Sequence, residues 1–423
     1  MTEAVVVSQL GARMHYAVPR ILHRAGLLEH FYTDICATKG WPRLLGHMPR
    51  RALNEGLRRL AGRIPVGIPT ERITCFSNAG LLHTMRRMRA RTASEETEAM
   101  LATAQAFSTR VVQRGFGNAG GFYGIAGECL EQIRAARAAG LWTAVEQIIA
   151  PRTIVDRLIL GEARRFPDWE GQGLQDRFAE AFAARERAEW AKADLIVCPS
   201  EFVRQAVAEC GGPVDRCVLV PYGVDARFQL PERNRIGGPL RVLTVGAVGL
   251  RKGSPYVAEA ARQLAGRAVF RMVGQCHLPD PVRSRLGQLV EITGPVPRAE
   301  IFDHYAWADV FLLPSICEGS ATVTYEALAA GLPVITTPNT GSVVRDGVDG
   351  FVVPIRDAAA IVESLTFLHD HRGRLAEMSR QARARAGDFD LASYGRRLCR
   401  ALAELRPAIP AQAGAPISAQ ALR

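Results

Sequence analysis

The sequence has 423 residues, of which 48% are hydrophobic and 22% charged, and its formal net charge is +11. This composition excludes a disordered chain, and the length exceeds what one hydrophobic core usually holds, so we expect a soluble protein of two domains. The charge excess is typical of proteins that bind nucleic acid, an anionic membrane or a phosphorylated substrate. Because no RNA-binding aromatic motif, recognition helix or zinc finger accompanies it, we expect no nucleic-acid partner.

The cysteines and the apolar segments indicate a cytoplasmic protein. Nine cysteines are scattered along the chain without a Cys-x-x-Cys pair or a Cys/His cluster, which argues against a disulfide framework or a zinc site. No segment resembles a signal peptide or a membrane span. At the start of the chain, the first residues include Glu3 and lead directly into an expected strand at 4–10. We expect a reducing cytoplasm, with attachment to the inner face of the membrane left open.

The chain opens with a strand, a loop and a helix. Residues 4–10 are apolar enough for a strand, Gly11 follows, and residues 14–25 have a helical pattern, as in the first turn of a doubly wound α/β domain. Gly11 would let the backbone approach a ligand closely. From loop position alone, we select three residues for the acceptor side of a site, namely Gly11, His15 and Glu146.

Residues 49–64 have the pattern of a basic amphipathic helix with one apolar face. Two interpretations remain open: a surface helix that packs this face on the core, and a helix that lies on an anionic bilayer through residues 50–63. The arginine-rich run at 86–91 adds some support to the second. The apolar face consists of Leu53, Leu57, Leu60 and Ile64, and the flanking cations are Arg50, Arg51, Arg58 and Arg59.

Residues 115–120 (GFGNAG) match the G-x-G-x-x-G pattern of dinucleotide-binding proteins, with Glu146 at the end of the next strand. This match allows a different function, that of an NAD-dependent oxidoreductase. We disfavour it, because the preceding RVVQR is a poor buried strand and the next helix begins only near Ala126. We expect the glycine-rich segment to form a loop that faces a cleft between two domains.

A second series of strands and helices begins after a linker at 231–239. A strand (241–248) is followed by Arg251 and Lys252 and then by a helix (255–264), for which we expect Ser254 as the cap. Two cations directly before the positive end of a helix are suited to a diphosphate. Lys252 is one of only three lysines, the others being Lys39 and Lys192.

The chain is organised around residues 314–338, which predict a tight loop, a helix and a strand after a buried strand at 309–313. Ser320 or Thr322 is expected to cap the helix, and Gly331 to end it. Glu318 and Glu326 are separated by seven residues. A carboxylate at Glu326 suits a ribose diol, and Glu318 lies nearer the phosphate site. Glycoside hydrolysis by these two acids is disfavoured, because phosphate-binding features surround them.

These residues carry a resemblance to a known family. The combination of Arg251-Lys252-Gly253, Glu318 with Glu326, VPYGVD at 220–225, ADLIVCPSEF at 193–202 and AAGLPVITT resembles the retaining glycosyltransferases of family 4. It covers about residues 190–390 well and the first part of the chain only loosely. It implies the GT-B fold, in which two Rossmann-like α/β domains face a cleft and a C-terminal helix crosses back to the first domain.

The resemblance also implies a function: transfer of a hexose-type sugar from a nucleotide-diphosphate sugar to a saccharide or lipid-linked acceptor, in polysaccharide or glycolipid synthesis. It implies retention of configuration by front-face attack and no cofactor or essential metal. Catalysis would depend on Glu318, Arg251 and Lys252. The implied donor-binding residues are Gly246, Arg251, Lys252, Gly274, Val296, Glu318, Gly319, Ser320, Ala321, Thr322 and Glu326.

One departure concerns the donor sugar. Family members commonly have a large apolar residue and a glycine after the Glu-Gly pair, whereas Ser320 and Ala321 stand here, so the sugar is not identified.

We expect an acceptor-binding domain at 1–234, completed by 390–407, a donor-binding domain at 235–389 and a disordered tail at 408–423. Besides the oxidoreductase, the alternative is a catalytically silent nucleotide-sugar-binding protein of the same fold.

Overall fold

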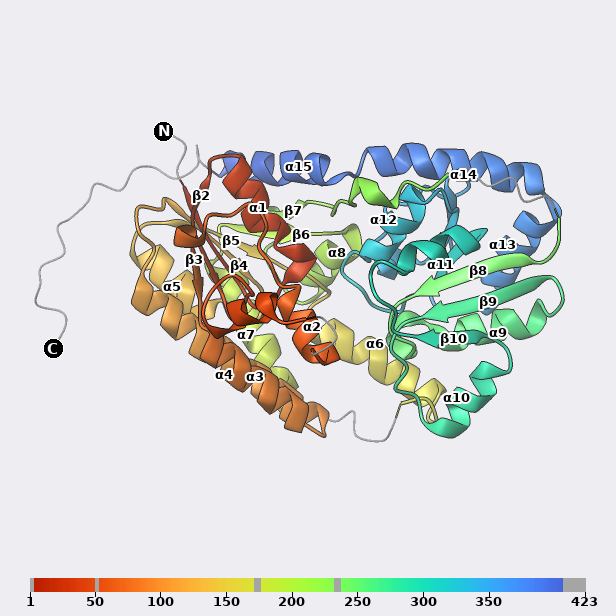
Figure 1. Cartoon of the computed structure of the whole chain (residues 1–423), viewed down its shortest axis with the longest axis horizontal. Coiled ribbons are helices and arrows are strands. Elements are labelled where there is room, and N and C mark those ends of the chain that lie inside the picture. Colours follow the sequence, from red (N-terminus) through yellow and green to blue (C-terminus); the bar gives the residue numbers. More distant parts are fainter. Residues whose placement is uncertain (1–3, 50–52, 171–175, 232–236, 406–423) are drawn as a thin grey trace, which may run out of the picture.

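The computed structural model describes residues 4–49, 53–170, 176–231 and 237–405. The expected tail at 408–423 and most of the expected linker lie outside the described residues. Figure 1 shows two α/β domains side by side, each built on a parallel sheet. Among the described helices, none is both long and apolar enough to cross a bilayer.

The sheet of the N-terminal domain has the order β3-β2-β1-β4-β5-β6-β7. Its central strands are fully buried, as expected for a parallel sheet covered on both faces. The strands are β1 (Val5–Gln9), β2 (Leu28–Thr33), β3 (Ile73–Cys75), β4 (Gly121–Ile125), β5 (Trp142–Glu146), β6 (Leu195–Cys198) and β7 (Cys217–Leu219). The helices are α1 (Ala17–Arg24), α2 (Glu55–Ala61), α3 (Ser77–Arg89), α4 (Ala93–Arg114), α5 (Leu130–Ala138), α6 (Arg152–Arg165), α7 (Ala179–Lys192) and α8 (Glu201–Glu209).

The sheet of the C-terminal domain has the order β10-β9-β8-β11-β12-β13. In both sheets the order reverses beside the first strand, at β1/β4 and at β8/β11, and such reversals open a crevice at the carboxyl edge. The strands are β8 (Leu240–Val245), β9 (Ala268–Val273), β10 (Glu291–Gly294), β11 (Val310–Leu313), β12 (Val334–Thr336) and β13 (Gly350–Val352). The helices are α9 (Ser254–Gln263), α10 (Asp280–Gly287), α11 (Ile301–Trp307), α12 (Thr322–Ala329), α13 (Ala358–Asp370) and α14 (Arg372–Gly387).

The last helix, α15 (Leu391–Glu404), returns to the N-terminal domain and packs on α1 (Figure 1). Its Tyr394, Leu398 and Leu402 are fully buried. Arg397 Nη2 donates to the carbonyl oxygens of Pro221 and Tyr222 at 3.0 and 3.2 Å. The expected fold class is therefore confirmed: two facing Rossmann-like domains and a C-terminal helix that crosses back to the first.

The expected helix at 14–25 begins later than its apolar pattern predicts. Met14, His15 and Tyr16 have φ values of 45°, 51° and 61°, and α1 starts at Ala17. Left-handed conformations are costly for residues other than glycine, so the surrounding structure must hold this turn in place. The turn places Met14 and His15 at the cleft between the domains, where both line cavities.

The expected amphipathic helix at 49–64 is wrong in its extent. Among the described residues of this segment, only α2 is helical, which is less than two turns, and the expected Arg50 and Arg51 lie outside the described residues. Leu53 is buried before the helix begins, whereas Ile64 is 45% exposed after it ends. Because the four apolar residues do not share one helix, they do not form the expected face.

The oxidoreductase alternative is contradicted by the place of residues 115–120. They follow the 22-residue helix α4 and precede β4, so they do not form the strand-to-helix turn that a dinucleotide needs. They also lie at the amino edge of the sheet, where Asn118 N–H donates to Glu29 Oε1 at 3.1 Å. The expectation that this loop faces the cleft is wrong for the same reason.

Candidate active site between the two domains

The centre of the site is a carboxylate that holds two cations. β8 and β11 are hydrogen-bonded neighbours, so the loops after them meet at one edge of the sheet. Arg251 Nη1 and Lys252 Nζ lie 2.6 and 2.7 Å from the same oxygen of Glu318, Oε1. These loops line a cavity of about 370 Å³. The three residues expected to be catalytic thus lie together.

Two glycines make the close packing of these loops possible. A Cβ atom at Gly253, whose φ is 70°, would lie 2.1 Å from the carbonyl oxygen of Pro314. A Cβ atom at Gly319 would lie 1.8 Å from the carbonyl oxygen of Ile148, in the N-terminal domain. Ser200 Oγ, also from that domain, donates to the Gly319 carbonyl at 2.5 Å. The Glu318 loop is therefore in direct contact with the opposite domain.

The start of α12 leaves backbone N–H groups available beside Glu318. The first N–H groups of a helix have no acceptor within it, and Thr322 and Val323 both line the 370 Å³ cavity. The expected side-chain cap is wrong, because the N-cap is Ala321 and Ser320 Oγ instead donates to the Gly341 carbonyl at 2.9 Å. An uncapped helix start of this kind suits an anion.

The start of α9 also lacks the expected side-chain cap. Its N-cap is Gly253, and the expected cap Ser254 instead accepts a hydrogen bond from Gly249 N–H at 3.0 Å, which closes the loop that carries Arg251 and Lys252. Burial lowers the pKa of Lys252; the Glu318 carboxylate opposes this shift and Arg251 adds to it. An opposing anion, such as a phosphate, would stabilise the charged ammonium further.

Glu326 lies in an adjoining cavity of about 270 Å³, which shares Met14 and Thr322 with the first. Tyr305 Oη donates to its Oε2 at 2.9 Å, and Arg298 Nη2 lies 3.5 Å from its Oε1. Burial raises the pKa of Glu326, whereas Arg298 and Tyr305 oppose the rise. The two glutamates thus occupy neighbouring compartments and have different partners.

Arg13 was not expected from the sequence, and it brings a third cation to the 370 Å³ cavity from the N-terminal domain. Its Nη2 donates to Tyr222 Oη at 2.9 Å, and Tyr222 donates in turn to Glu146 Oε1 at 2.7 Å. The other oxygen of Glu146 accepts from Tyr123 Oη at 2.9 Å. Glu146, which was expected on the acceptor side, is buried and contacts Arg13 through Tyr222.

The other expected residues are distributed around the site. His15, which was expected on the acceptor side, lines the same cavity as Glu326. A Cβ atom at Gly246 would lie 3.0 Å from Cε of Lys252, and one at Gly274 would lie 2.0 Å from the Gly246 carbonyl oxygen, so this pair packs behind the lysine stem. Val296 is partly buried and packs on the hydrophobic core.

A larger cavity of about 1090 Å³ lies at the reversal point of the N-terminal sheet. Gly11 and Glu128, which follow β1 and β4, line it, and Ile148 and Ile149 line both this cavity and the one around Glu318. Gly11 N–H donates to Asp34 Oδ1, and Leu10 N–H to Glu128 Oε2, both at 2.9 Å. Burial raises the pKa of Glu128 to about 8.

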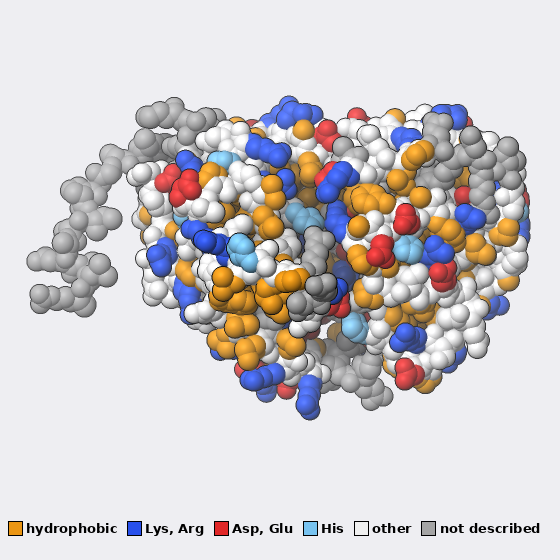
Figure 2. All heavy atoms as spheres, viewed as in Figure 1, with side chains coloured by type: hydrophobic (Ala, Val, Ile, Leu, Met, Phe, Trp, Pro, Cys, Tyr) orange, Lys and Arg blue, Asp and Glu red, His pale blue; other side chains and the backbone are white. Residues whose placement is uncertain are grey.

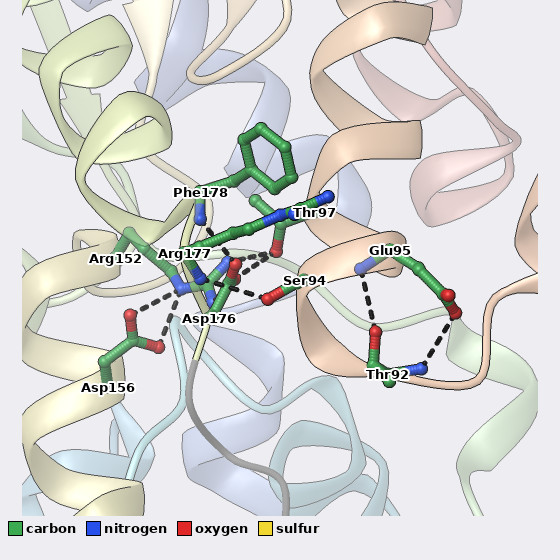
Figure 3. A network of polar contacts seen from close by, with 9 residues as sticks. All are labelled: Thr92, Ser94, Glu95, Thr97, Arg152, Asp156, Asp176, Arg177 and Phe178. Carbon is green, nitrogen blue, oxygen red and sulfur yellow. Dashed lines mark hydrogen bonds and ion pairs between the residues drawn. The ribbon is translucent and has the colours of Figure 1, made fainter.

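The wall of this cavity is held by the polar network in Figure 3, which joins the starts of α4 and α6. Arg152 Nε donates to both oxygens of Asp156 at 2.7 and 2.8 Å, and its Nη1 donates to Thr97 at 3.0 Å. Arg152 also pairs with Asp176. Thr92 and Glu95 form a capping box that fixes the first turn of α4 at the cavity rim.

Comparison with solved structures shows which fold this chain has. Over 95% of this chain and all of the other, the structure is similar to Alr3699/HepE of Anabaena, described in complex with UDP and glucose, with a TM-score of 0.58 and 15% identity. It is similar to sucrose-phosphate synthase of Thermosynechococcus elongatus over 96% of this chain and all of the other, with a TM-score of 0.67 and 16% identity. The chain has the GT-B fold of glycosyltransferases.

The sequence comparisons narrow this class. Residues 239–371 match the family described as glycosyl transferases group 1, so the C-terminal domain is a group 1 glycosyltransferase domain. The chain is 29% identical to the colanic acid biosynthesis glycosyltransferase WcaL of Salmonella typhimurium over 49% of its length and 56% of that protein's. It is 27% identical to the amylovoran biosynthesis glycosyltransferase AmsK of Erwinia amylovora over 46% and 52%. The match spans little more than half of these relatives.

Proposed function

We propose that the protein transfers a hexose-type sugar from a nucleotide-diphosphate sugar to a saccharide or lipid-linked acceptor, in polysaccharide or glycolipid synthesis. The observation that carries this proposal is the pair of cations on Glu318 Oε1 beside an uncapped helix start. A guanidinium has five N–H donors and an ammonium has three, so donors remain for the oxygens of a diphosphate after the contacts with Glu318.

The nucleoside is proposed to lie in the cavity of Glu326, which adjoins the diphosphate cavity. Glu326 has the depth and the fixed orientation to accept hydrogen bonds from the ribose diol, because Tyr305 and Arg298 hold its two oxygens. The sugar would then lie near Glu318 and face the N-terminal domain, where the 1090 Å³ cavity takes the acceptor.

The proposed reaction depends on the cations around the leaving phosphate. As the bond between the sugar and the diphosphate breaks, negative charge develops on the leaving phosphate, and preorganised cations stabilise it more in the transition state than in the ground state. Arg251 and Lys252 would act from the C-terminal domain and Arg13 from the opposite side. Retention would come from front-face attack by the acceptor hydroxyl, whose proton passes to the departing phosphate, with Glu318 orienting the sugar.

Metal independence is part of this proposal, because cations and helix N–H groups already surround the leaving group. A transfer assay with and without a chelating agent tests it, and loss of turnover with the chelator would contradict it. We also propose a cytoplasmic location, which the nine free cysteines support.

The first experiment is a calorimetric screen, without metal, of UDP, GDP, ADP, their sugar conjugates and NAD. We expect one diphosphate nucleotide to bind and Lys252→Ala to weaken it strongly, with the exposed Lys192→Ala as the matched control. Binding without any turnover, with a broad panel of acceptors, would favour the catalytically silent alternative. No diphosphate binding, or binding that Lys252→Ala leaves intact, would contradict the donor site.

A further inference from the structure

The positive charge of the chain is concentrated in one segment of the N-terminal domain. Residues 41–91 contain eleven arginines and two glutamates, a net charge of +9 in a chain whose total is +11. The cations of the donor site lie elsewhere in the sequence. The function proposed above therefore accounts for little of the charge excess, and this segment requires a separate explanation.

Exposed apolar side chains gather in the same part of the molecule. Of the fourteen large apolar side chains that are exposed among the described residues, nine lie between Leu44 and Met100. Figure 2 shows hydrophobic side chains gathered on the lower front of the N-terminal domain, with Lys and Arg beside them. Scattered apolar side chains need no explanation, but a contiguous group indicates an interaction surface. The nine are Leu44, Met48, Ile64, Val66, Leu81, Leu82, Met85, Met88 and Met100.

Helix α3 is the central element of this surface. Gly80 is its only buried residue, and a Cβ atom there would lie 2.9 Å from Cβ of Ile35, so the helix packs closely at this point. The rest of α3 lies along α4, with its side chains from Leu81 on exposed or half-buried. Leu81, Leu82 and Met85 are 43 to 48% exposed, and Met88 is 81% exposed. Arg86, Arg87 and Arg89 lie in its last turn. We call the exposed apolar side chains and the arginines of residues 81–89 the α3 face.

The α3 face is continuous with the large cavity of the N-terminal domain. Met88 is the most exposed of the apolar side chains and also lines the 1090 Å³ cavity, as do Arg87 and Arg91. The same cavity reaches Ile148 and Ile149 at the donor site. A molecule held at the α3 face can therefore extend through the cavity toward Glu318.

We propose that the α3 face binds an anionic lipid bilayer. An anionic surface attracts the arginines, each of which contributes about fivefold to partitioning, while methionine and leucine side chains enter the acyl boundary. Two copies of a face with this charge would repel each other, which disfavours self-association. A nucleic acid would use the arginines but has no need of apolar side chains that project beyond them.

This assignment names the acceptor class for the proposed transferase, on whose function it rests: a lipid-linked acceptor with an anionic linkage. Its lipid part stays in the bilayer, the arginines at the cavity mouth contact the anionic linkage, and the part that receives the sugar enters the cavity. It also moves the expected membrane contact from residues 50–63 to the α3 face.

Co-sedimentation with vesicles tests the membrane contact without any nucleotide sugar. We expect the full-length protein to bind vesicles of phosphatidylcholine and phosphatidylglycerol in equal parts, and not vesicles of phosphatidylcholine alone. Met85→Ser/Met88→Ser is expected to weaken binding at least about tenfold, and Arg86→Gln/Arg89→Gln about twenty-five-fold. Leu289→Ser/Val348→Ser and Arg283→Gln/Arg380→Gln, at exposed positions of the C-terminal domain, are the matched controls.

Several outcomes would overturn the proposal: no binding to the anionic vesicles, or control variants that weaken binding as much as the α3 variants. A dimer in sedimentation velocity that Met85→Ser/Met88→Ser dissociates would assign the face to a second copy instead. Binding of UDP, GDP or ADP and thermal unfolding, measured on each variant, show that the site and the fold are intact. Failure of nucleotide binding with intact vesicle binding would contradict the transferase and leave the α3 face assigned.

The acceptor class has its own test. The nucleotide sugar that binds in the screen, labelled in the sugar, is incubated with the protein and isolated membranes of the source organism. We expect the label in the fraction that organic solvent extracts, and its rate of incorporation should fall with Met85→Ser/Met88→Ser. Label that enters only water-soluble products would show that the acceptor is not lipid-linked.

Discussion

The two domains share one architecture but differ at the point where the strand order reverses. In the C-terminal domain, the loops after β8 and β11 close tightly around one carboxylate and two cations. In the N-terminal domain, the loops after β1 and β4 stand at a cavity of about 1090 Å³, lined by acidic, basic and apolar side chains. Under the proposed function, the narrow site recognises a diphosphate and a ribose, and the wide one accommodates an acceptor of less constant shape.

The largest effect is expected at the cations of the narrow site. Lys252→Met keeps most of the unbranched side chain but removes the charged ammonium group, so the leaving diphosphate loses one preorganised donor. We expect the transfer rate to fall about 10²- to 10³-fold. Steady-state kinetics of the variant measure this, with the exposed Lys192→Met as control. A change of less than about threefold would mean that the narrow site does not stabilise the transition state.

Glu326 lines the cavity proposed for the nucleoside, which adjoins the cavity proposed for the diphosphate. Glu326→Gln leaves the Tyr305 contact possible but removes the charged acceptor, and hydrogen bonds to charged groups contribute about 1.5–3 kcal/mol. We therefore expect nucleotide affinity to fall about ten- to a hundredfold in calorimetry. The 2′-deoxynucleotide should bind weakly to the wild type and no worse to the variant. Equal losses for both nucleotides would place Glu326 away from the ribose.

Gly319 tests the contact between the two domains. A Cβ atom there would lie 1.8 Å from the Ile148 carbonyl oxygen, so Gly319→Ala must push the domains apart. Overpacking of this kind costs about 1–3 kcal/mol, and we expect a lower unfolding temperature and slower transfer with nucleotide binding largely kept. Gly287→Ala, where no atom lies within 4 Å of the added Cβ, is the control. Unchanged transfer would show that the contact is dispensable.

The smallest effect is expected at the positioning of Arg13. Tyr222→Phe removes one hydroxyl that contacts both Arg13 and Glu146. Such a hydrogen bond contributes about 0.5–1.5 kcal/mol, so we expect the rate to fall about two- to tenfold while nucleotide affinity stays constant. Tyr394→Phe is a close control: its ring packs edge-on against Tyr222 at 5.8 Å, and its hydroxyl has no hydrogen-bond partner among the described residues. Equal effects of the two variants would contradict a role for Arg13.

The narrow site could be predicted from the sequence because short local sequence patterns specify the loops that form it. Arg251, Lys252 and Glu318 each lie in a short loop between an apolar strand and a helix, and strand order alone brings the two loops together. The predicted helix caps were wrong, since the Ser320 hydroxyl bonds to the Gly341 carbonyl, 21 positions away, and the Ser254 hydroxyl bonds to Gly249 in the loop before its own helix.

The N-terminal side could not be predicted in the same way. Arg13 depends on Tyr222, which lies 209 positions away, and on a left-handed turn at Met14 that the apolar pattern does not signal. Glu146 ends a strand as a site residue would, but two tyrosine hydroxyls occupy its carboxylate. Residues 115–120 match a glycine motif, but the helix before them places it at the wrong edge of the sheet.

The return of α15 to the N-terminal domain has a consequence for synthesis of the chain. Tyr394, Leu398 and Leu402 fill the space beside α1, so the core around α1 is incomplete until residues 391–404 have left the ribosome. The C-terminal domain has all of its strands by then. The domain that is made first is therefore completed last, and a nascent chain that stops before Leu391 would expose an apolar groove on α1, a surface for chaperones or for aggregation.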